Sequence, residues 1–315
     1  MHNDERLDPG QTIRRRWVLA GLAGALAACT TVPKPAVVDA ASPPAAPPAA
    51  APPKPPPRLP RIGLALGGGA ARGFAHIGVI QVLEENGIKP DLVVGTSAGS
   101  LVAALYASGK SGAELALLAD SMDESAFTDW SFPGRGLIRG EALAKYVRDH
   151  TGARPIEQMR TPLGIVATDL DSGQPILFQR GDAGVAVRAS SAVPAVFQPV
   201  RIGTHEYVDG GLVSPVPVRF ARQMGAEIVI AVDISAAPDG NATGDPMRML
   251  LQTFAIMGRS INGFELRDAD VVLRPKLPGV SGADFTSRKK SILAGREATL
   301  AQLAALREKI ALKSL

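Results

Sequence analysis

A serine between two glycines stands where an apolar run of the sequence breaks. Residues 95–99 read Gly-Thr-Ser-Ala-Gly and follow the apolar run 92–94. This G-x-S-x-G pattern is typical of a sharp turn from a strand into a helix, which exposes the serine hydroxyl. Gly95 and Gly99 leave room for the backbone to pass close to Ser97, and the first N–H groups of the helix point at a developing negative charge. Ser97 is therefore the candidate nucleophile.

The histidines of the chain offer one kind of general base for this serine. In α/β-hydrolases the histidine of the triad follows both the serine and the acid, but no histidine occurs after His205. His150 and His205 stay open as bases. Their surroundings, a helix end and a turn, are typical of exposed structural positions.

An aspartate followed by two glycines offers a second kind of base. Asp209 precedes Gly210 and Gly211, which allow the backbone to approach a neighbour closely. Its carboxylate could accept the Ser97 proton directly, although its ordinary pKa near 3.9 makes it a weaker base than imidazole. Such a dyad depends on a dry site and on strong oxyanion stabilisation. A plain turn is the alternative interpretation of Asp-Gly-Gly.

A run of glycines after the first apolar strand could supply that stabilisation. Residues 67–73 read Gly-Gly-Gly-Ala-Ala-Arg-Gly, and consecutive glycines before a helix can present N–H groups to an anion. Loss of one oxyanion donor typically costs about 3–4 kcal/mol of transition-state stabilisation. The spacing of Gly67, Gly69 and Gly73 misses the dinucleotide pattern G-x-G-x-x-G by one residue, and no P-loop Lys-Ser/Thr pair follows. A nucleotide-binding oxidoreductase is therefore the weaker interpretation. Arg72 either assists anion binding or forms a surface salt bridge.

Short apolar runs alternate with helical patterns over residues 61–315. The expected strands are 62–66, 91–94, 163–167, 176–178, 227–234 and 271–273, and the expected helices are 74–83, 100–108, 246–266 and 287–313. This alternation predicts a single α/β domain whose mostly parallel sheet is covered on both faces.

The first sixty residues are expected to be an export signal and a tether. A basic cluster precedes twelve weakly apolar residues, 17–28, which are too few to span a bilayer but suit a signal peptide. The four residues that end in Cys29 resemble the lipobox of bacterial lipoproteins, which predicts a signal peptide over 1–28 and a lipid on Cys29. An incidental cysteine after an ordinary signal peptide is the alternative. Residues 14–19 also resemble a twin-arginine export signal. Residues 29–60 carry twelve prolines from position 30 onward, and this composition predicts an extended linker.

Composition excludes several classes of protein. The single cysteine excludes a disulfide scaffold, and the four histidines lack metal-ligand spacing. A net charge of +4 and 4% aromatic residues argue against nucleic acid as a partner.

Three motifs follow one another along the chain: the glycine run 67–73, the serine pentapeptide 95–99 and Asp-Gly-Gly at 209–211. In this order they resemble the motifs of the patatin-like phospholipase family, notably its bacterial branch related to the neuropathy target esterase domain. The stretch 189–197 looks like a further block of that family. The resemblance covers residues 61–315. It implies a three-layer α/β/α fold and a Ser–Asp dyad without histidine, with no cofactor and no metal. It also implies hydrolysis of fatty-acyl esters of phospholipids or lysophospholipids through an acyl-enzyme.

Carried over by position, the resemblance makes Ser97 the nucleophile and Asp209 the base. The backbone amides expected to form the oxyanion hole are those of Gly68, Gly69, Arg72 and Gly73.

With the lipoprotein leader, the expectation is a membrane-anchored enzyme of the bacterial cell envelope that acts on lipid at a membrane surface. The irregular apolar stretch 127–140 either lines an acyl channel or packs in the core. Two alternatives stay open: a non-lipid carboxylesterase or thioesterase with the same dyad, and a non-catalytic envelope protein that uses the fold for binding.

Overall fold

The computed structural model describes residues 58–122, 129–130, 134–236, 244–282 and 284–314. The described residues lie within one compact unit of the chain, Pro55–Leu315. The expected signal peptide, Cys29 and almost all of the linker lie outside the described residues and stay predictions. Among the described helices, none is both long enough and apolar enough to cross a membrane.

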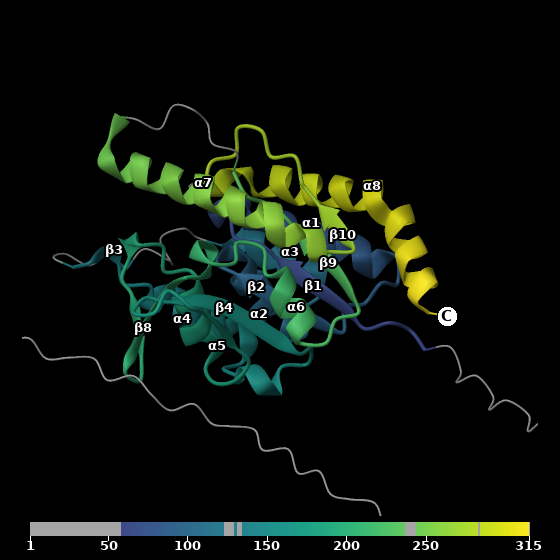
Figure 1. Ribbon diagram of the computed structural model, residues 1–315, viewed down its shortest axis with the longest axis horizontal. Coiled ribbons are helices and arrows are strands. Elements are labelled where there is room, and N and C mark those ends of the chain that lie inside the picture. The colour runs from purple at the N-terminus through teal and green to yellow at the C-terminus, as the bar shows by residue number, and fades with distance from the viewer. Residues whose placement is uncertain (1–57, 123–128, 131–133, 237–243, 283, 315) are drawn as a thin grey trace, which may run out of the picture. The chain divides into compact units, whose positions relative to one another are not determined.

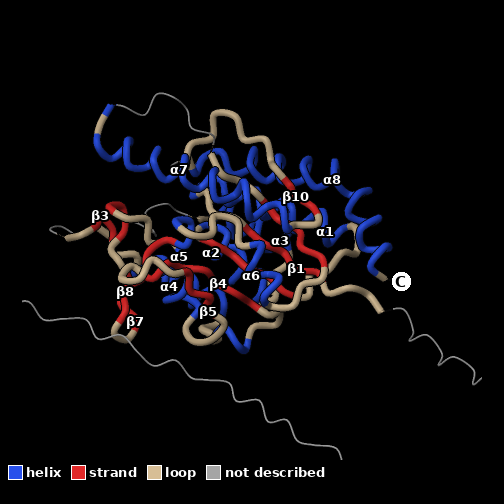
Figure 2. The backbone as a smooth tube through the Cα atoms, viewed as in Figure 1, coloured by secondary structure: helices blue, strands red, loops and turns tan. Residues whose placement is uncertain are grey.

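An eight-stranded sheet forms the centre of the domain (Figure 2). Its order is β10-β9-β1-β2-β4-β8-β7, and β5 pairs with β4. The strands are β1 (Ile62–Leu66), β2 (Leu92–Thr96), β4 (Leu163–Asp169), β5 (Pro175–Phe178), β7 (Val200–Ile202), β8 (His205–Asp209), β9 (Ile228–Val232) and β10 (Val271–Leu273). The five strands from β10 to β4 are parallel, whereas β5, β8 and β7 join antiparallel. The predicted mostly parallel sheet is confirmed. A separate two-stranded sheet consists of β3 (Gly136–Ile138) and β6 (Ala195–Phe197).

Helices cover both faces of this sheet. They are α1 (Phe74–Glu85), α2 (Ala98–Ala107), α3 (Gly112–Ser121), α4 (Glu141–Thr151), α5 (Ala183–Ser190), α6 (Val218–Gln223), α7 (Pro246–Glu265) and α8 (Arg288–Lys313). Side chains alternate along a strand, so Leu64 and Leu66 of β1 join the core under α1, α2 and α8. Ala65 between them joins a second core under α6. The three-layer α/β/α architecture is therefore present (Figure 1).

Strand pairing brings the candidate residues together at one end of the strands. Leu66 lies opposite Gly95 in the β1–β2 pair, so the glycine run and the serine turn leave the sheet side by side. Asp209 ends β8 and lies opposite Ala167 of β4, which also pairs with β2. Three segments far apart in the sequence thus meet at the carboxyl ends of the parallel strands, where open α/β sheets bind ligands.

The stretch 127–140 is only partly described. Residues 127–128 and 131–133 lie outside the described residues, while Gly136–Ile138 form β3 beside β6. Leu137 of β3 and Trp130 are exposed, so these side chains do not pack in the core. The expectation of an acyl channel in this stretch stays a prediction.

Candidate active site

Ser97 lies on a tight, strained turn between β2 and α2. Its φ of 52° and ψ of −124° are unusual for a residue with a side chain and store roughly 1–3 kcal/mol of strain. Glycine is needed on both sides of it. A Cβ on Gly95 would lie 2.4 Å from the Gly99 carbonyl oxygen, and one on Gly99 would lie 2.1 Å from the Leu66 carbonyl oxygen. The predicted strand-to-helix turn is therefore real, and its geometry explains both glycines.

Asp209 accepts a hydrogen bond from the candidate nucleophile. The Ser97 hydroxyl donates to Asp209 Oδ2 at 2.7 Å, and the Gly211 amide donates to Oδ1 at 2.7 Å. The carboxylate is buried, with 6% of the residue exposed. Burial disfavours its charged form and raises the pKa of Asp209 to about 6, although the Ser97 and Gly211 hydrogen bonds partly oppose this. The carboxylate is thus a stronger base than an exposed aspartate.

The described histidines lie away from this hydrogen bond. His150 bonds the Tyr146 carbonyl oxygen on α4 through Nδ1 at 2.9 Å. His205, at the exposed start of β8, pairs through Nδ1 with Asp169 Oδ2 at 2.8 Å. His76 is fully buried and donates from Nε2 to the Gly67 carbonyl oxygen at 2.8 Å. Burial lowers the pKa of His76 to about 4, so this imidazole is neutral. Among the described residues, no histidine bonds Ser97.

The glycine loop passes directly beside the nucleophile. A Cβ on Gly68 would lie 3.1 Å from Ser97 Cβ, and one on Gly73 would lie 2.9 Å from Ala98 Cβ. The loop is also strained, because Ala70 has a φ of 49°. Residues Ala70–Gly73 form one turn of 3-10 helix that leads into α1.

The backbone amides of this loop differ in whether they already donate a hydrogen bond within the chain. The Gly68 N–H donates to the Pro215 carbonyl oxygen at 2.9 Å, and the Arg72 N–H donates to the Gly69 carbonyl oxygen at 3.2 Å. Within the described part of the chain, the Gly69 N–H has no acceptor. The Arg72 side chain also donates to the Gly69 carbonyl, from Nε at 3.3 Å, and burial lowers the pKa of its guanidinium. The Gly69 amide is therefore free to bind an oxyanion, whereas the amides of Gly68 and Arg72 are occupied.

Ser190 supports the turn and was missed as a site residue in the sequence. The Ser97 N–H donates to Ser190 Oγ at 2.9 Å, and the Ser190 hydroxyl donates to the Val166 carbonyl oxygen at 2.5 Å. Ser190 is fully buried at the end of α5. Its only sequence signal was its place within the block 189–197, which does not indicate what the hydroxyl contacts.

Replacing Ser190 with alanine is expected to lower the free energy of unfolding by about 1–3 kcal/mol, because the Ser97 amide and the Val166 carbonyl both lose their partner. Urea unfolding measures this change. Ser191→Ala is the matched control, since the neighbouring hydroxyl makes no hydrogen bond to a described residue. Equal stability of the two variants would show that Ser190 does not support the turn.

The segment after Asp209 connects the turn, the glycine loop and α7. The Ser214 carbonyl accepts from Thr96 Oγ1 at 2.9 Å, and the adjacent Pro215 carbonyl accepts from Gly68. The Ser214 hydroxyl donates to Glu265 Oε2 at 2.7 Å, at the end of α7. Burial raises the pKa of Glu265 to about 7, although Arg219 lies 2.9 Å from Oε1. Ser214 and Pro215 thus connect the serine turn, the glycine loop and α7.

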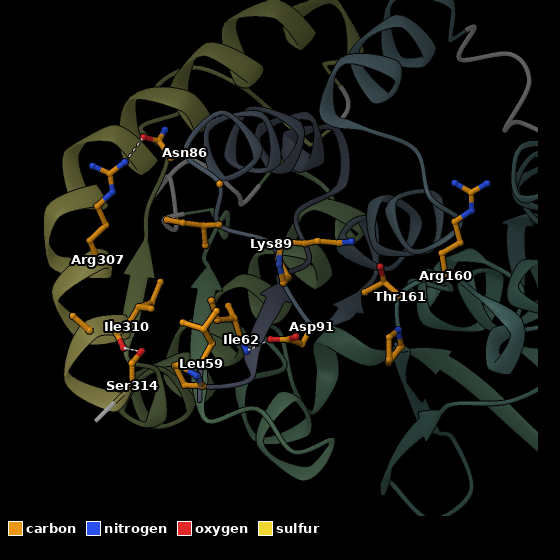
Figure 3. A pocket seen from close by; sticks show the side chains of 16 residues that line it. Leu59, Ile62, Asn86, Lys89, Asp91, Arg160, Thr161, Arg307, Ile310 and Ser314 are labelled. Carbon is orange, nitrogen blue, oxygen red and sulfur yellow. Dashed lines mark hydrogen bonds between the residues drawn. The ribbon is translucent and has the colours of Figure 1, made fainter. Parts of the chain in front are cut away.

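Two other features lie apart from the dyad. Asp169, Asp171 and His205 bring possible metal-ligating atoms within 4.8 Å of one another. However, Asp169 already accepts the N–H groups of Asp171 and Ser172 and pairs with His205, as expected of a turn. A hollow lined by residues such as Ile62, Asp91, Arg160 and Arg307 opens at the amino ends of the parallel strands (Figure 3). That is the end of the sheet opposite to Ser97.

Comparison with known proteins gives three findings. The family profile described as patatin-like phospholipase matches residues 64–222, which include Ser97 and Asp209. An uncharacterized NTE family protein of Mycobacterium tuberculosis is 39% identical over 186 residues, which cover 58% of this chain and 51% of that protein. Patatin-like phospholipase domain-containing protein 6 of Mus musculus is 34% identical over 184 residues, covering 56% of this chain and 14% of that protein. The chain thus spans about half the length of the mycobacterial relatives it matches.

The fold also resembles that of a solved structure. VipD from Legionella pneumophila superimposes with a TM-score of 0.53, at 15% identity, over 79% of this chain and 67% of that chain. At this identity the likeness concerns the fold alone.

Proposed function

We propose, because this chain belongs to the patatin-like phospholipase family, that it is a serine acyl hydrolase that cleaves fatty-acyl esters of phospholipids or lysophospholipids. One observation carries the proposal. Ser97 lies on a strained turn at the start of a helix, and its hydroxyl donates to the buried Asp209 carboxylate at 2.7 Å. Nucleophilic catalysis needs a hydroxyl within hydrogen-bond reach of a base.

Acylation uses both groups of the dyad. Ser97 Oγ attacks the carbonyl carbon of the ester while Asp209 Oδ2 takes the hydroxyl proton. The oxygen of the tetrahedral intermediate becomes negative and lies near the free Gly69 amide and the amino end of α2. When the intermediate collapses, the bond to the alcohol breaks and Asp209 returns the proton to the leaving oxygen. The products of this step are the free alcohol, such as a lysophospholipid, and an ester of Ser97.

Deacylation repeats the same steps with water. A water molecule attacks the acyl carbon of the Ser97 ester through its oxygen, and Asp209 takes a proton from this water. The second tetrahedral intermediate collapses with release of the fatty acid, and Asp209 returns the proton to Ser97 Oγ. The free enzyme is restored, and the net reaction consumes one water molecule.

Fatty-acid release from phospholipid and lysophospholipid by the full chain tests this proposal. We expect kcat/KM to rise about tenfold per pH unit below a pH of about 6 and to level off above it, because only ionised Asp209 accepts the proton. A scan of initial rates from pH 4 to 8 measures the midpoint. Turnover confined to short, water-soluble esters would favour the non-lipid esterase instead. No turnover of any ester by the folded chain would favour a binding role.

A further inference from the structure

Large apolar side chains are exposed along one helix near the site. Among the described residues of α7, only Gly258 and Asn262 are buried. Five large apolar residues of this helix are instead exposed: Met249 (58%), Leu251 (42%), Ile256 (54%), Met257 (44%) and Phe264 (66%). Burying a large apolar side chain removes unfavourable contact with water, so five exposed ones on one helix need an explanation.

Four of these side chains, those of Met249, Ile256, Met257 and Phe264, share one solvent-exposed side of α7. Met249 and Ile256 are seven residues apart, as are Met257 and Phe264, which places each pair on one side of a helix. The opposite side is exposed at Leu251 but contacts the rest of the domain from Gly258 onward. Gly258 lies over the Pro215 ring, with a hypothetical Cβ 3.5 Å from it, and Glu265 accepts from Ser214. We call the group Met249, Ile256, Met257 and Phe264 the α7 stripe.

Three arginines flank the α7 stripe, while Asp245 and Asp268 lie beyond the two ends of the helix. Arg248 and Arg259 lie on the exposed part of the helix, and the Arg267 guanidinium lies 5.1 Å from the Phe264 ring. Arg248 pairs with Asp245 at 3.3 Å, whereas Arg259 has no ion pair to a residue that the structure describes. Glu265, the helix's only carboxylate, faces Ser214 and Arg219. An apolar face flanked by arginines is typical of helices that lie in the surface of an anionic bilayer.

We propose that the α7 stripe docks onto the surface of an anionic lipid bilayer. The other side of the helix lies against the segment that follows Asp209, so docking holds this part of the domain close to the lipid surface. Lipid chains accommodate the irregular outline of methionine, isoleucine and phenylalanine side chains, and anionic head groups match the arginines. The inference deepens the proposed function and rests on it for the nature of the substrate, but docking itself is measured without turnover.

The test compares two triple variants of the full chain. The first replaces three residues of the stripe: Met249→Gln, Ile256→Gln and Phe264→Gln. The second changes the matched leucines of α8, which have similar exposures of 52–60%: Leu293→Gln, Leu300→Gln and Leu312→Gln. Glutamine keeps helix propensity high. All chains carry Cys29→Ser to remove the predicted lipid site, and Ser97→Ala to remove turnover.

Co-sedimentation with phosphatidylcholine vesicles, with and without phosphatidylglycerol, measures docking. We expect phosphatidylglycerol to strengthen binding and salt to weaken it. The α7 variant is expected to bind at least about tenfold more weakly than its parent, and the α8 variant to bind like the parent. Equal binding of the two variants, or no binding by the parent, overturns the proposal. Dissociation of a dimer in the α7 variant, with vesicle binding unchanged, overturns it in favour of a second copy of this chain.

A second readout separates docking from chemistry. With Ser97 restored, the α7 variant is expected to hydrolyse a short soluble ester at the parent's rate but vesicle lipid at least about tenfold more slowly. Loss of both activities, with vesicle binding intact in the Ser97→Ala background, would overturn docking through the α7 stripe. Vesicle binding that depends on the stripe in a chain that hydrolyses no ester would remove the proposed function and leave docking in place.

Discussion

Replacing Ser97 with alanine is expected to lower kcat/KM for ester hydrolysis by at least about 10⁴-fold, because no other group can form the acyl-enzyme. The fold should persist, since alanine keeps the β2–α2 turn and its amide still donates to Ser190. Fatty-acid release measures the loss, and a fluorophosphonate probe followed by peptide mapping identifies the labelled serine.

Ser108→Ala is the matched control for this variant. Ser108 follows the same helix, and its hydroxyl donates only to the Leu105 carbonyl oxygen one turn earlier. This variant should keep both turnover and labelling. Turnover that survives in Ser97→Ala, or a label on another serine, contradicts the assignment of the nucleophile.

Replacing Asp209 with asparagine is expected to abolish turnover and stabilise the protein. The loss in kcat should be at least about 10⁴-fold, because an amide cannot take the Ser97 proton. The gain in stability arises because the variant no longer buries a charge. The pKa of Asp209 rises from 3.8 to about 6 on folding, so its ionisation weakens the native state by about 3 kcal/mol at neutral pH. Asparagine fits the same partners, since its oxygen can accept from Gly211 and its amide can donate to Ser97.

The pH dependence of this stability gain has a definite sign. The native state binds the Asp209 proton more tightly than the unfolded chain, so the parent loses stability as pH rises from about 4 to about 6. The stability advantage of Asp209→Asn should therefore be small at pH 4, grow between these values and be full at pH 8. Urea unfolding of both chains across this range measures it.

Asp169→Asn provides a contrast of opposite sign. Backbone N–H groups, that of Ser172 first, lower the pKa of Asp169, so its charge favours the native state. Replacing Asp169 should lower the free energy of unfolding at neutral pH. This difference should disappear as the pH falls through the pKa of the native carboxyl. An Asp209→Asn chain that is no more stable than its parent at pH 8 would refute the buried, high-pKa carboxylate.

The elements with strong local patterns could be predicted from sequence. The buried apolar runs 62–66 and 271–273 coincide with β1 and β10, and 246–266 with α7 to within one residue. The ranges of α3, α4, α5 and α6 and of β3, β6, β7 and β8 could not be predicted. The strands β3, β6 and β7 have three residues each, and α5 consists largely of small residues. These elements therefore show no clear hydrophobic periodicity in the sequence.

The site shows the same division between local and distant information. The strand, turn and helix around Ser97 follow from a five-residue pattern. The support from Ser190 and the occupation of the Gly68 amide by Pro215 depend on contacts between distant segments. Likewise, apolar residues stand on every side of α7, and the sequence alone does not tell which side meets solvent.

The length of chain between the two members of the dyad has a consequence for folding. Ser97 and Asp209 are 112 positions apart in sequence, and β4 lies between their strands in the sheet. Closing so long a loop costs conformational entropy before any contact rewards it. A chain in which β8 has not yet paired with β4 therefore has a serine but no base beside it. By the proposed mechanism, hydrolysis requires this distant pairing, so we expect a chain that has not completed it to leave lipid esters intact.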